Sequence, residues 1–207
     1  MKRAACVGLL CLVGCGSQSG SGASSQGALP AGYVAPAPTD NLPLVDHPEY
    51  AAWSRFPVGA GVVRKKEVTN EFGNVRVTTT VRLAEKTADK VVVQTQITVD
   101  RAAEGLVENE PQTVDFPAKF RLPANMKLEQ FALPSLRAKA VGEEAREVAG
   151  REFKAEVFTW QEFSERGQMT IKLWRSDEIP GRMLRQEING PMHNSVEEVV
   201  EILQPAG

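Results

Sequence analysis

Residues 75–83 read VRVTTTVRL, and their alternation constrains the fold of this chain more than any other segment. Valine, threonine and leucine occupy the odd positions from Val75 to Leu83, whereas arginine and threonine occupy the even positions. Successive side chains of a β-strand point to opposite faces of a sheet. The pattern therefore predicts a strand with one buried face and one wet face.

The segments on either side extend this strand into a meander. VVRKKEVTN (62–70) precedes it across a turn at Phe72–Asn74, and KVVVQTQITVD (90–100) follows a turn at Lys86–Asp89. Such short connections exclude the helical crossover that parallel strands need, so we expect antiparallel pairing. Upstream, PEYAAWSRF (48–56) predicts a short helix that ends before Pro57 and docks on the sheet through Trp53.

Period-two patterns return after residue 144. AREVAGREFKAEVFTWQEF (145–163) predicts two strands around a turn at Gly150, and MTIKLW (169–174) and RMLRQEI (182–188) predict two more around Pro180-Gly181. For SVEEVVEIL (195–203) the β-branched residues favour a closing strand, although a capping box of Ser195 and Glu198 leaves a helix open. Prolines break residues 101–141 into what we expect to be edge strands and loops.

These segments define the expected fold class, which is mainly β. We expect about eight to ten strands in a single curved antiparallel sheet or half-barrel, with a short N-terminal helix. The chain divides into residues 1–14 as a signal peptide, residues 15–46 as a tether rich in Gly, Ser, Ala and Pro, and residues 47–205 as the β domain. The alternative to a flexible tether is a structured arm that packs on the body through Tyr33, Val34 or Leu42 and Leu44.

The first residues explain the signal-peptide prediction. A basic head at Lys2 and Arg3 precedes ten uncharged residues, 4–13, too few to span a bilayer and typical of a signal peptide. Leu12-Val13-Gly14-Cys15 resembles the bacterial lipobox, which implies cleavage before Cys15 and acylation of that cysteine. An ordinary signal peptide that is cut within the following Ser/Gly stretch is the alternative.

Composition narrows the classes of partner. All three cysteines lie in the first fifteen residues, so the remaining chain forms no internal disulfide and no thiolate metal site. The chain has 24 basic and 26 acidic residues, and loss of Lys2 and Arg3 with the signal peptide changes its formal charge from −2 to −4. This balance gives no basic excess for nucleic acid, so the lipid on Cys15 is the expected membrane contact.

A second resemblance concerns the later half of the body. VAGREFKAEVF followed by IKLWRSDEIPGRMLRQEI resembles secreted bacterial domains of unknown function. These are related in architecture to the Lol-type lipoprotein carriers, half-barrels that shelter acyl chains. The resemblance implies this fold, with binding of a lipid or another apolar ligand as one outcome. The chain departs from these carriers in showing no clear set of helices in its middle to plug such a barrel.

The sequence offers no catalytic pattern. His47 and His193 have no neighbouring ligands at metal spacing, and we expect both in exposed loops. Neither a nucleophile elbow nor a phosphate-binding glycine loop is present, although a dispersed Ser-His-Asp set stays open. RSDE (175–178) at a strand end is either a turn held by side chains or a ligand contact. We therefore expect no enzyme, no metal and no cofactor.

Three aromatic residues form the candidate ligand or partner face: Phe158, Trp160 and Trp174. Two readings stay open, one in which the tryptophans pair across neighbouring strands and are covered by the chain itself, and one in which they line a concave face. The sequence thus predicts an exported lipoprotein of the bacterial envelope, in the outer membrane where the cell has one. Its expected role is non-catalytic binding or scaffolding of an envelope protein, and the alternative is a carrier of lipid or another apolar ligand.

Overall fold

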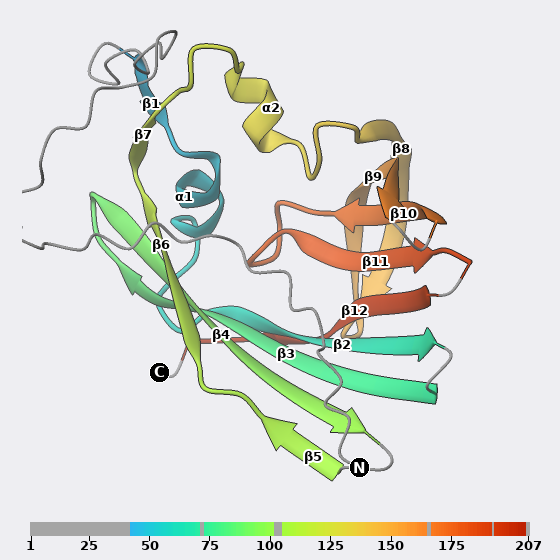
Figure 1. Ribbon diagram of the computed structural model, residues 1–207. Coiled ribbons are helices and arrows are strands. Elements are labelled where there is room, and N and C mark those ends of the chain that lie inside the picture. Colours follow the sequence, from blue (N-terminus) through green and yellow to red (C-terminus); the bar gives the residue numbers. More distant parts are fainter. Residues whose placement is uncertain (1–41, 71–72, 102–104, 165–166, 192, 206–207) are drawn as a thin grey trace, which may run out of the picture. The chain divides into compact units, whose positions relative to one another are not determined.

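The computed structural model describes residues 42–70, 73–101, 105–164, 167–191 and 193–205. Cys15, the expected signal peptide and most of the expected tether lie outside the described residues. The elements are β1 (Leu44–Asp46), α1 (Pro48–Trp53), β2 (Gly61–Asn70), β3 (Gly73–Lys86), β4 (Lys90–Arg101), β5 (Gly105–Glu108), β6 (Gln112–Pro117), β7 (Lys119–Arg121), α2 (Leu128–Ala132), β8 (Lys139–Val148), β9 (Arg151–Ser164), β10 (Gly167–Arg175), β11 (Met183–Asn189) and β12 (His193–Leu203) (Figure 1).

Ten of these strands form one open antiparallel sheet. Its order is β5-β4-β3-β2-β12-β11-β10-β9-β8, and β6 pairs with β4 beside β5. The meander that the sequence predicts, β2–β4, joins a second meander, β8–β12, where β12 pairs with β2. The mainly β fold class is confirmed, and the sheet does not close into a barrel because β8 and the β5–β6 edge do not pair.

The closing segment is a strand. Ten residue pairs align β12 with β2, from His193 opposite Asn70 to Leu203 opposite Gly61. The helical alternative for residues 195–203 is therefore wrong, because pairing on both sides of β12 satisfies its backbone in an extended form. At the turn before β9, Ala149 and Gly150 have φ of 50° and 73°, as a tight hairpin requires.

The middle of the chain contains a helix that the sequence analysis missed. Strands β5 and β6 are edge strands on β4, as expected, but residues 128–132 form α2. The backbone N–H of Lys127 donates to Oε1 of Gln130 at 2.7 Å, which caps the helix, and Phe131 packs edge-on against Phe120 at 4.9 Å between ring centroids. A five-residue helix of this kind leaves no apolar period to detect.

The fold begins earlier than the predicted boundary at His47. Residues 44–46 form β1, which pairs with β7 in a separate two-stranded sheet, with Val45 opposite Phe120. The Leu122 N–H also donates to the carbonyl of Pro43 at 2.9 Å. The end of the expected tether thus pairs with β7 through its backbone, while the Leu44 side chain, through which the structured-arm alternative would pack, is 58% exposed.

The first helix docks on the sheet through Trp53, as predicted. This side chain is 3% exposed and belongs to the larger of two buried clusters, the large core. Gly181, with φ of 74°, comes so close that a Cβ there would lie 3.2 Å from the Trp53 ring. The large core comprises Trp53, Val62, Val81, Leu83, Val91, Val93, Val148, Phe153, Ala155, Val157, Trp174, Ile179, Leu184 and Val199.

The second cluster, the small core, lies in the later meander. Its buried members are Phe158, Trp160, Ile171 and Leu173. They share a face of the sheet because Phe158 pairs with Leu173 and Trp160 pairs with Ile171. Neither α1 nor α2, the helices of the described residues, has the length and apolar character that crossing a bilayer would require.

Candidate ligand groove

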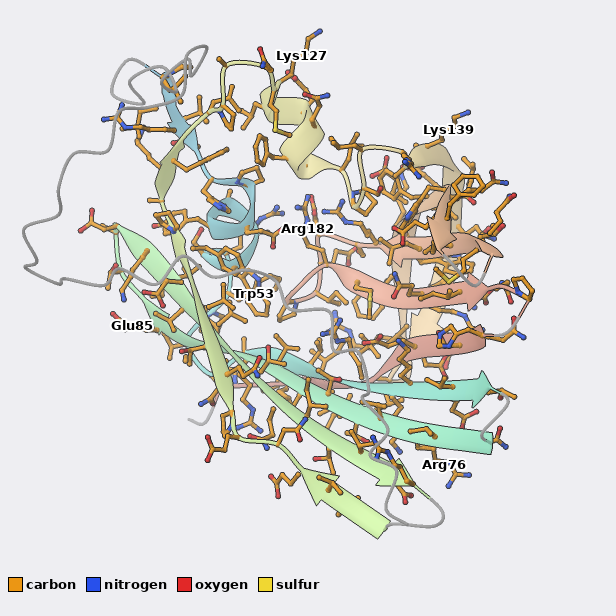
Figure 2. All side chains as sticks on the ribbon, in the orientation of Figure 1. Trp53, Arg76, Glu85, Lys127, Lys139 and Arg182 are labelled. Atoms are coloured by element: carbon orange, nitrogen blue, oxygen red, sulfur yellow. The ribbon has the colours of Figure 1, made fainter. Side chains whose placement is uncertain are left out.

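Two adjoining hollows lie between the helices and the sheet, and we call them together the groove. The first hollow has a volume of about 310 Å³ and the second about 200 Å³, and both are lined by Glu49, Gly181 and Met183. Glu49 comes from α1, whereas Gly181 and Met183 come from the β10–β11 connection and the start of β11. Trp53 and Arg182, labelled in Figure 2, belong to these same two parts of the chain.

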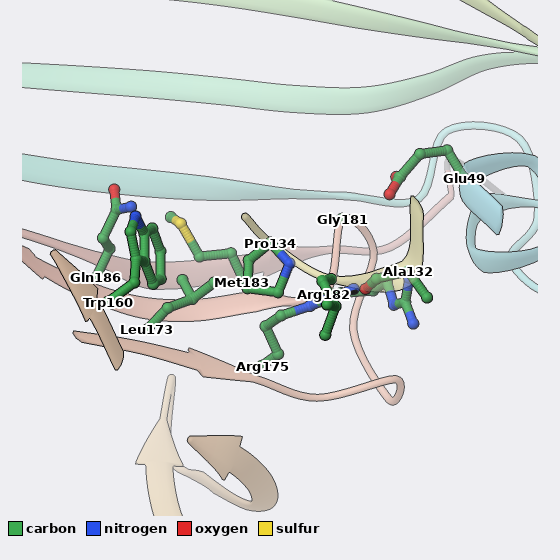
Figure 3. A pocket seen from close by; sticks show the side chains of 11 residues that line it. Glu49, Ala132, Pro134, Trp160, Leu173, Arg175, Gly181, Arg182, Met183 and Gln186 are labelled. Atoms are coloured by element: carbon green, nitrogen blue, oxygen red, sulfur yellow. Dashed lines mark hydrogen bonds between the residues drawn. The ribbon is translucent and has the colours of Figure 1, made fainter. Parts of the chain in front are cut away.

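One end of the first hollow is mainly apolar, with the Gln186 amide beside Trp160 as a polar group (Figure 3). Its wall consists of Trp160 and Leu173 from the small core, with Met183 and the Leu133-Pro134 segment after α2 beside them (Figure 3). The β9–β10 register explains this wall, because Trp160 on β9 and Leu173 on β10 are diagonal neighbours on the same face of the sheet. The Trp160 indole satisfies its own N–H by donating to Oε1 of Glu162 at 2.9 Å. This end offers apolar surface to a ligand.

The other end of the first hollow is charged. Arg175 and Arg182 lie there, with Glu49 facing them from α1 (Figure 3). Nε of Arg182 donates to Oδ1 of Asp177 at 2.8 Å, and a nitrogen of the Arg175 guanidinium donates to the carbonyl of Ala132 at 2.7 Å. Burial lowers the pKa of Arg175, and repulsion from Arg182 lowers it further. An arginine nevertheless stays protonated in proteins, so both side chains are cations.

The RSDE segment (175–178) forms a turn, and its first residue also lines the groove. The Glu178 N–H approaches Oγ of Ser176 at 3.4 Å, and Asp177 pairs with Arg182 and, at 3.5 Å, with Arg55. These contacts hold the turn, as one of the two alternatives predicts. Arg175, the first residue of the segment, lines the first hollow, so the ligand-contact alternative stays open for that residue alone.

The second hollow is mainly apolar, with Arg64, Glu49 and Thr95 as its charged and polar residues. Its apolar lining is Trp53, Val62, Val81, Val93, Val114, Phe116, Pro180 and Met183. Arg64 also lines it and pairs with Glu197 at 3.4 Å, while a nitrogen of the same guanidinium lies 3.5 Å from Sδ of Met183. The buried Nε of Arg64 has no hydrogen-bond partner among the described residues.

The structure separates the three aromatic residues that the sequence grouped. Phe158 and Trp160 belong to the small core, whereas Trp174 belongs to the large core. Trp174 pairs with Val157, which points to the opposite face from Phe158. The expectations that the tryptophans pair or share a face are therefore wrong. Both tryptophans have even residue numbers, but residue numbers do not fix the register between two strands, and the register decides which side chains share a face.

Neighbouring side chains cover Trp174. The ring is 2% exposed, and three cations lie over it at 4.6 Å for Arg146, 4.4 Å for Lys172 and 5.9 Å for Arg185. Cations over an indole face are attracted by the ring quadrupole. Cover by the chain itself, the first of the two readings, thus describes Trp174, and of the three predicted aromatic residues only Trp160 lines the groove.

Neither histidine is the exposed loop residue that the sequence predicts. His47 is half-buried, with its ring centroid 5.5 Å from that of Phe116 and 5.0 Å from that of Phe120. His193 is the first residue of β12. His47 lies in the connection between β1 and α1, as expected, whereas the loop prediction for His193 is wrong; both side chains are half-buried rather than exposed. No group of three His, Cys, Asp or Glu side chains within the described ranges has the spacing to hold a metal ion.

Comparison with known proteins finds loose structural likeness. No protein-family model matches the sequence, and no curated protein matches it. A "putative lipoprotein" from Parabacteroides distasonis has a TM-score of 0.42 at 11% identity, over 71% of this chain and 97% of that chain. The hypothetical protein CT021 from Chlamydia trachomatis has a TM-score of 0.40 at 11% identity, over 79% of this chain and 96% of that chain.

A third structure is more distant. It is a "putative outer membrane lipoprotein-sorting protein domain" from Vibrio parahaemolyticus, with a TM-score of 0.25 and 7% identity, over 75% of this chain and 89% of that chain. At such TM-scores these likenesses say nothing of ligand or activity.

Most of the groove carries no signal in the sequence. Met183, which lines both hollows, and the Leu133-Pro134 wall carried no signal, because their positions depend on how α1 and the segment after α2 face the sheet. Arg175 was singled out within RSDE, and that segment is the one signal that pointed to the charged end. Chemically, the groove combines an apolar wall with a guanidinium group, and this arrangement suits the binding of a ligand.

Proposed function

We propose that this chain is an exported bacterial envelope lipoprotein, anchored through Cys15, whose β domain binds an apolar chain without catalysis. The lipobox-like segment ending at Cys15 supports the anchor. The sequence resemblance to domains related to Lol-type carriers supports the binding role, and the groove supplies a place for it. An exported domain with these features would hold or shelter an acyl chain at the envelope.

The apolar end of the first hollow is the observation that carries the binding role. Trp160, Leu173 and Met183 present apolar surface there beside Pro134. Removal of apolar area from water contributes roughly 25 cal/mol per Å². Ligand sites are typically hollows of roughly 300–1,000 Å³ with apolar walls and a few placed polar groups, and the first hollow, at about 310 Å³, lies at the lower end of that range.

The lining of the two hollows holds no Ser-His or Cys-His pair among the described residues. None of the described residues that line the two hollows is serine, cysteine or histidine. These are the usual nucleophiles and general bases of hydrolases. A Ser-His-Asp triad would need its members elsewhere, whereas Glu49, which lines both hollows, is a carboxylate of the kind that can act as a general base.

An uncharged apolar dye tests the binding role. N-phenyl-1-naphthylamine should gain fluorescence with the full-length protein, and Met183→Glu should abolish the gain because a carboxylate would stand in both hollows. Met169→Glu is the matched control, since Met169 packs on the small core and lines neither hollow. Circular dichroism checks that both variants fold. Absence of dye binding by the parent protein, or equal binding by both variants, would refute the role.

A protein partner is the second candidate, and an exposed patch favours it. Leu136 and Phe163 are 64% and 68% exposed and line a common hollow of about 390 Å³ with Arg137 and Glu162. Exposed apolar groups rimmed by polar ones mark protein contacts. Crosslinking in cells should then enrich one envelope protein that a Leu136→Ser, Phe163→Ser double variant does not enrich. Equal recovery with both forms would contradict this candidate.

A further inference from the structure

We infer that the ligand of the first hollow is a single-chain amphiphile with an anionic headgroup, and that Arg175 binds this headgroup. The inference rests on the proposed binding role and names its ligand class. It follows from the division of the hollow into an apolar end and a cationic end (Figure 3).

Arg175 differs from the other cations of the groove in its partners. Arg182 is bound to Asp177 at 2.8 Å, and Arg64 is paired with Glu197 at 3.4 Å. For Arg175, no carboxylate of the described residues lies within 4.0 Å. A half-buried cation without an acidic partner favours an anion from outside, because the anion would compensate its lost hydration.

The guanidinium of Arg175 has donors to spare. One N–H donates to the Ala132 carbonyl at 2.7 Å, and the guanidinium lies 5.7 Å from the Phe158 ring centroid. A guanidinium has five N–H donors in a planar fork, which matches a carboxylate or a phosphate in a bidentate manner. The bond to Ala132 therefore fixes the side chain while leaving further donors for a headgroup.

The strand geometry sets the apolar tail beside this headgroup site. Arg175 is two residues beyond Leu173 on β10 and four beyond Ile171, which pairs with Trp160. Four residues of strand span about 13 Å, so an extended chain that starts at Arg175 would pass Leu173 and reach Trp160. A volume of about 310 Å³ suits one chain rather than several.

The described acidic residues near Arg175 reduce the positive potential of the headgroup site, but none of them pairs with the Arg175 guanidinium. Glu49, Asp177 and Glu156 all act on Arg175 by attraction, whereas Arg182 repels it and adds positive charge to the same end. Asp177 is already bound by Arg182 and Arg55. Arg175, Arg182 and Glu49, the charged residues that line the hollow, leave one net positive charge there.

A matched pair of probes tests the headgroup. We expect the full-length protein to bind NBD-labelled dodecanoic acid more tightly than its methyl ester. Arg175→Gln should weaken binding of the acid by roughly ten- to a hundredfold, the range for hydrogen bonds to charged groups, and leave the ester unchanged. Arg55→Gln is the control. It also removes a cation, one that pairs with Asp177, but Arg55 lines neither hollow.

The outcomes separate this inference from the proposed function. If the protein binds acid and ester equally, the anionic headgroup is refuted while the binding role stands. Absence of binding by both probes refutes the binding role and the inference together. Equal losses for acid and ester in Arg175→Gln would show that Arg175 only holds the segment at Ala132. Arg175→Lys, which keeps the charge, should retain the preference for the acid, and loss of that preference would contradict a charge-based site.

Discussion

The indole N–H of Trp174 donates to Oε2 of Glu144 at 2.6 Å and thereby links β10 to β8 across β9. Lys172 reaches Oε1 of the same carboxylate at 3.2 Å. The carboxylate thus lies between an indole N–H and an ammonium group, at the edge of the sheet that β8 forms. Hydrogen bonds lower the pKa of Glu144, and the bond from Trp174 contributes more to this shift than the bond from Lys172.

Acid should weaken the fold through Glu144. A carboxyl group with a lowered folded-state pKa stabilises the fold above its ordinary pKa, near 4.5 here, and this contribution is lost as the pH falls through the folded-state value. Glu144→Gln should therefore be less stable than the parent at neutral pH and lose less on acidification. Urea midpoints measured by circular dichroism across the acid range test this. Glu143→Gln, which removes an exposed pair with Lys154, is the control.

His47 should make stability depend on pH in a higher range. Its Nδ1 accepts the Glu49 N–H at 3.1 Å, which requires the neutral ring, and burial lowers the pKa of His47 below 6.5 despite the opposing charge of Glu49. The stabilising contribution is present above 6.5 and is lost as the pH falls from there through the folded-state pKa, because the unfolded chain takes up the proton first.

His47→Asn should flatten this dependence. Asparagine keeps an acceptor at the helix N-cap but does not titrate, so the variant should show a smaller decrease in urea midpoint below pH 6.5 than the parent does. His193→Asn, at the start of β12, is the comparison for loss of the other histidine. A dependence that persists unchanged in His47→Asn would contradict this role for the helix cap.

Truncation of two leucines should change the free energy of unfolding by very different amounts. Leu83 is 0% exposed in the large core, whereas Leu106 on β5 is 72% exposed. Leu83→Ala should lower the free energy of unfolding by about 2–5 kcal/mol, from lost burial and the cavity left behind. Leu106→Ala should change it by less than about 0.5 kcal/mol. Urea unfolding of both variants measures the difference, and similar losses would contradict the assignment of the core.

Loss of the thiol at Cys15 should release the protein from the membrane. We expect Cys15→Ser to appear in the soluble envelope fraction, and metabolic labelling with palmitate should mark the parent but not Cys15→Ser. Cys11→Ser, within the expected signal peptide, should leave labelling and fractionation unchanged. Membrane association of Cys15→Ser at the level of the parent would refute the lipobox interpretation.

The sequence located most strands but not their mutual faces. Alternation at Val75–Leu83 and the short turn at Gly150 suffice for local structure, because side-chain period and turn chemistry are local properties. Trp160 and Trp174 lie in adjacent strands, and their faces depend on the pairing of Trp174 with Val157. A shift of one residue in that register would exchange the faces, and the alternation of each strand is the same for either register.

Local pattern therefore determined, by itself, that this chain forms an antiparallel meander and further strands behind a leader-like segment. Only the tertiary structure decided that His47 contacts both Phe116 and Phe120 and that Met183 lines both hollows. It also decided that Arg175 has no acidic partner among the described residues. These contacts join segments tens of residues apart, and such packing follows from how the elements pair and cover one another rather than from any periodicity along the chain.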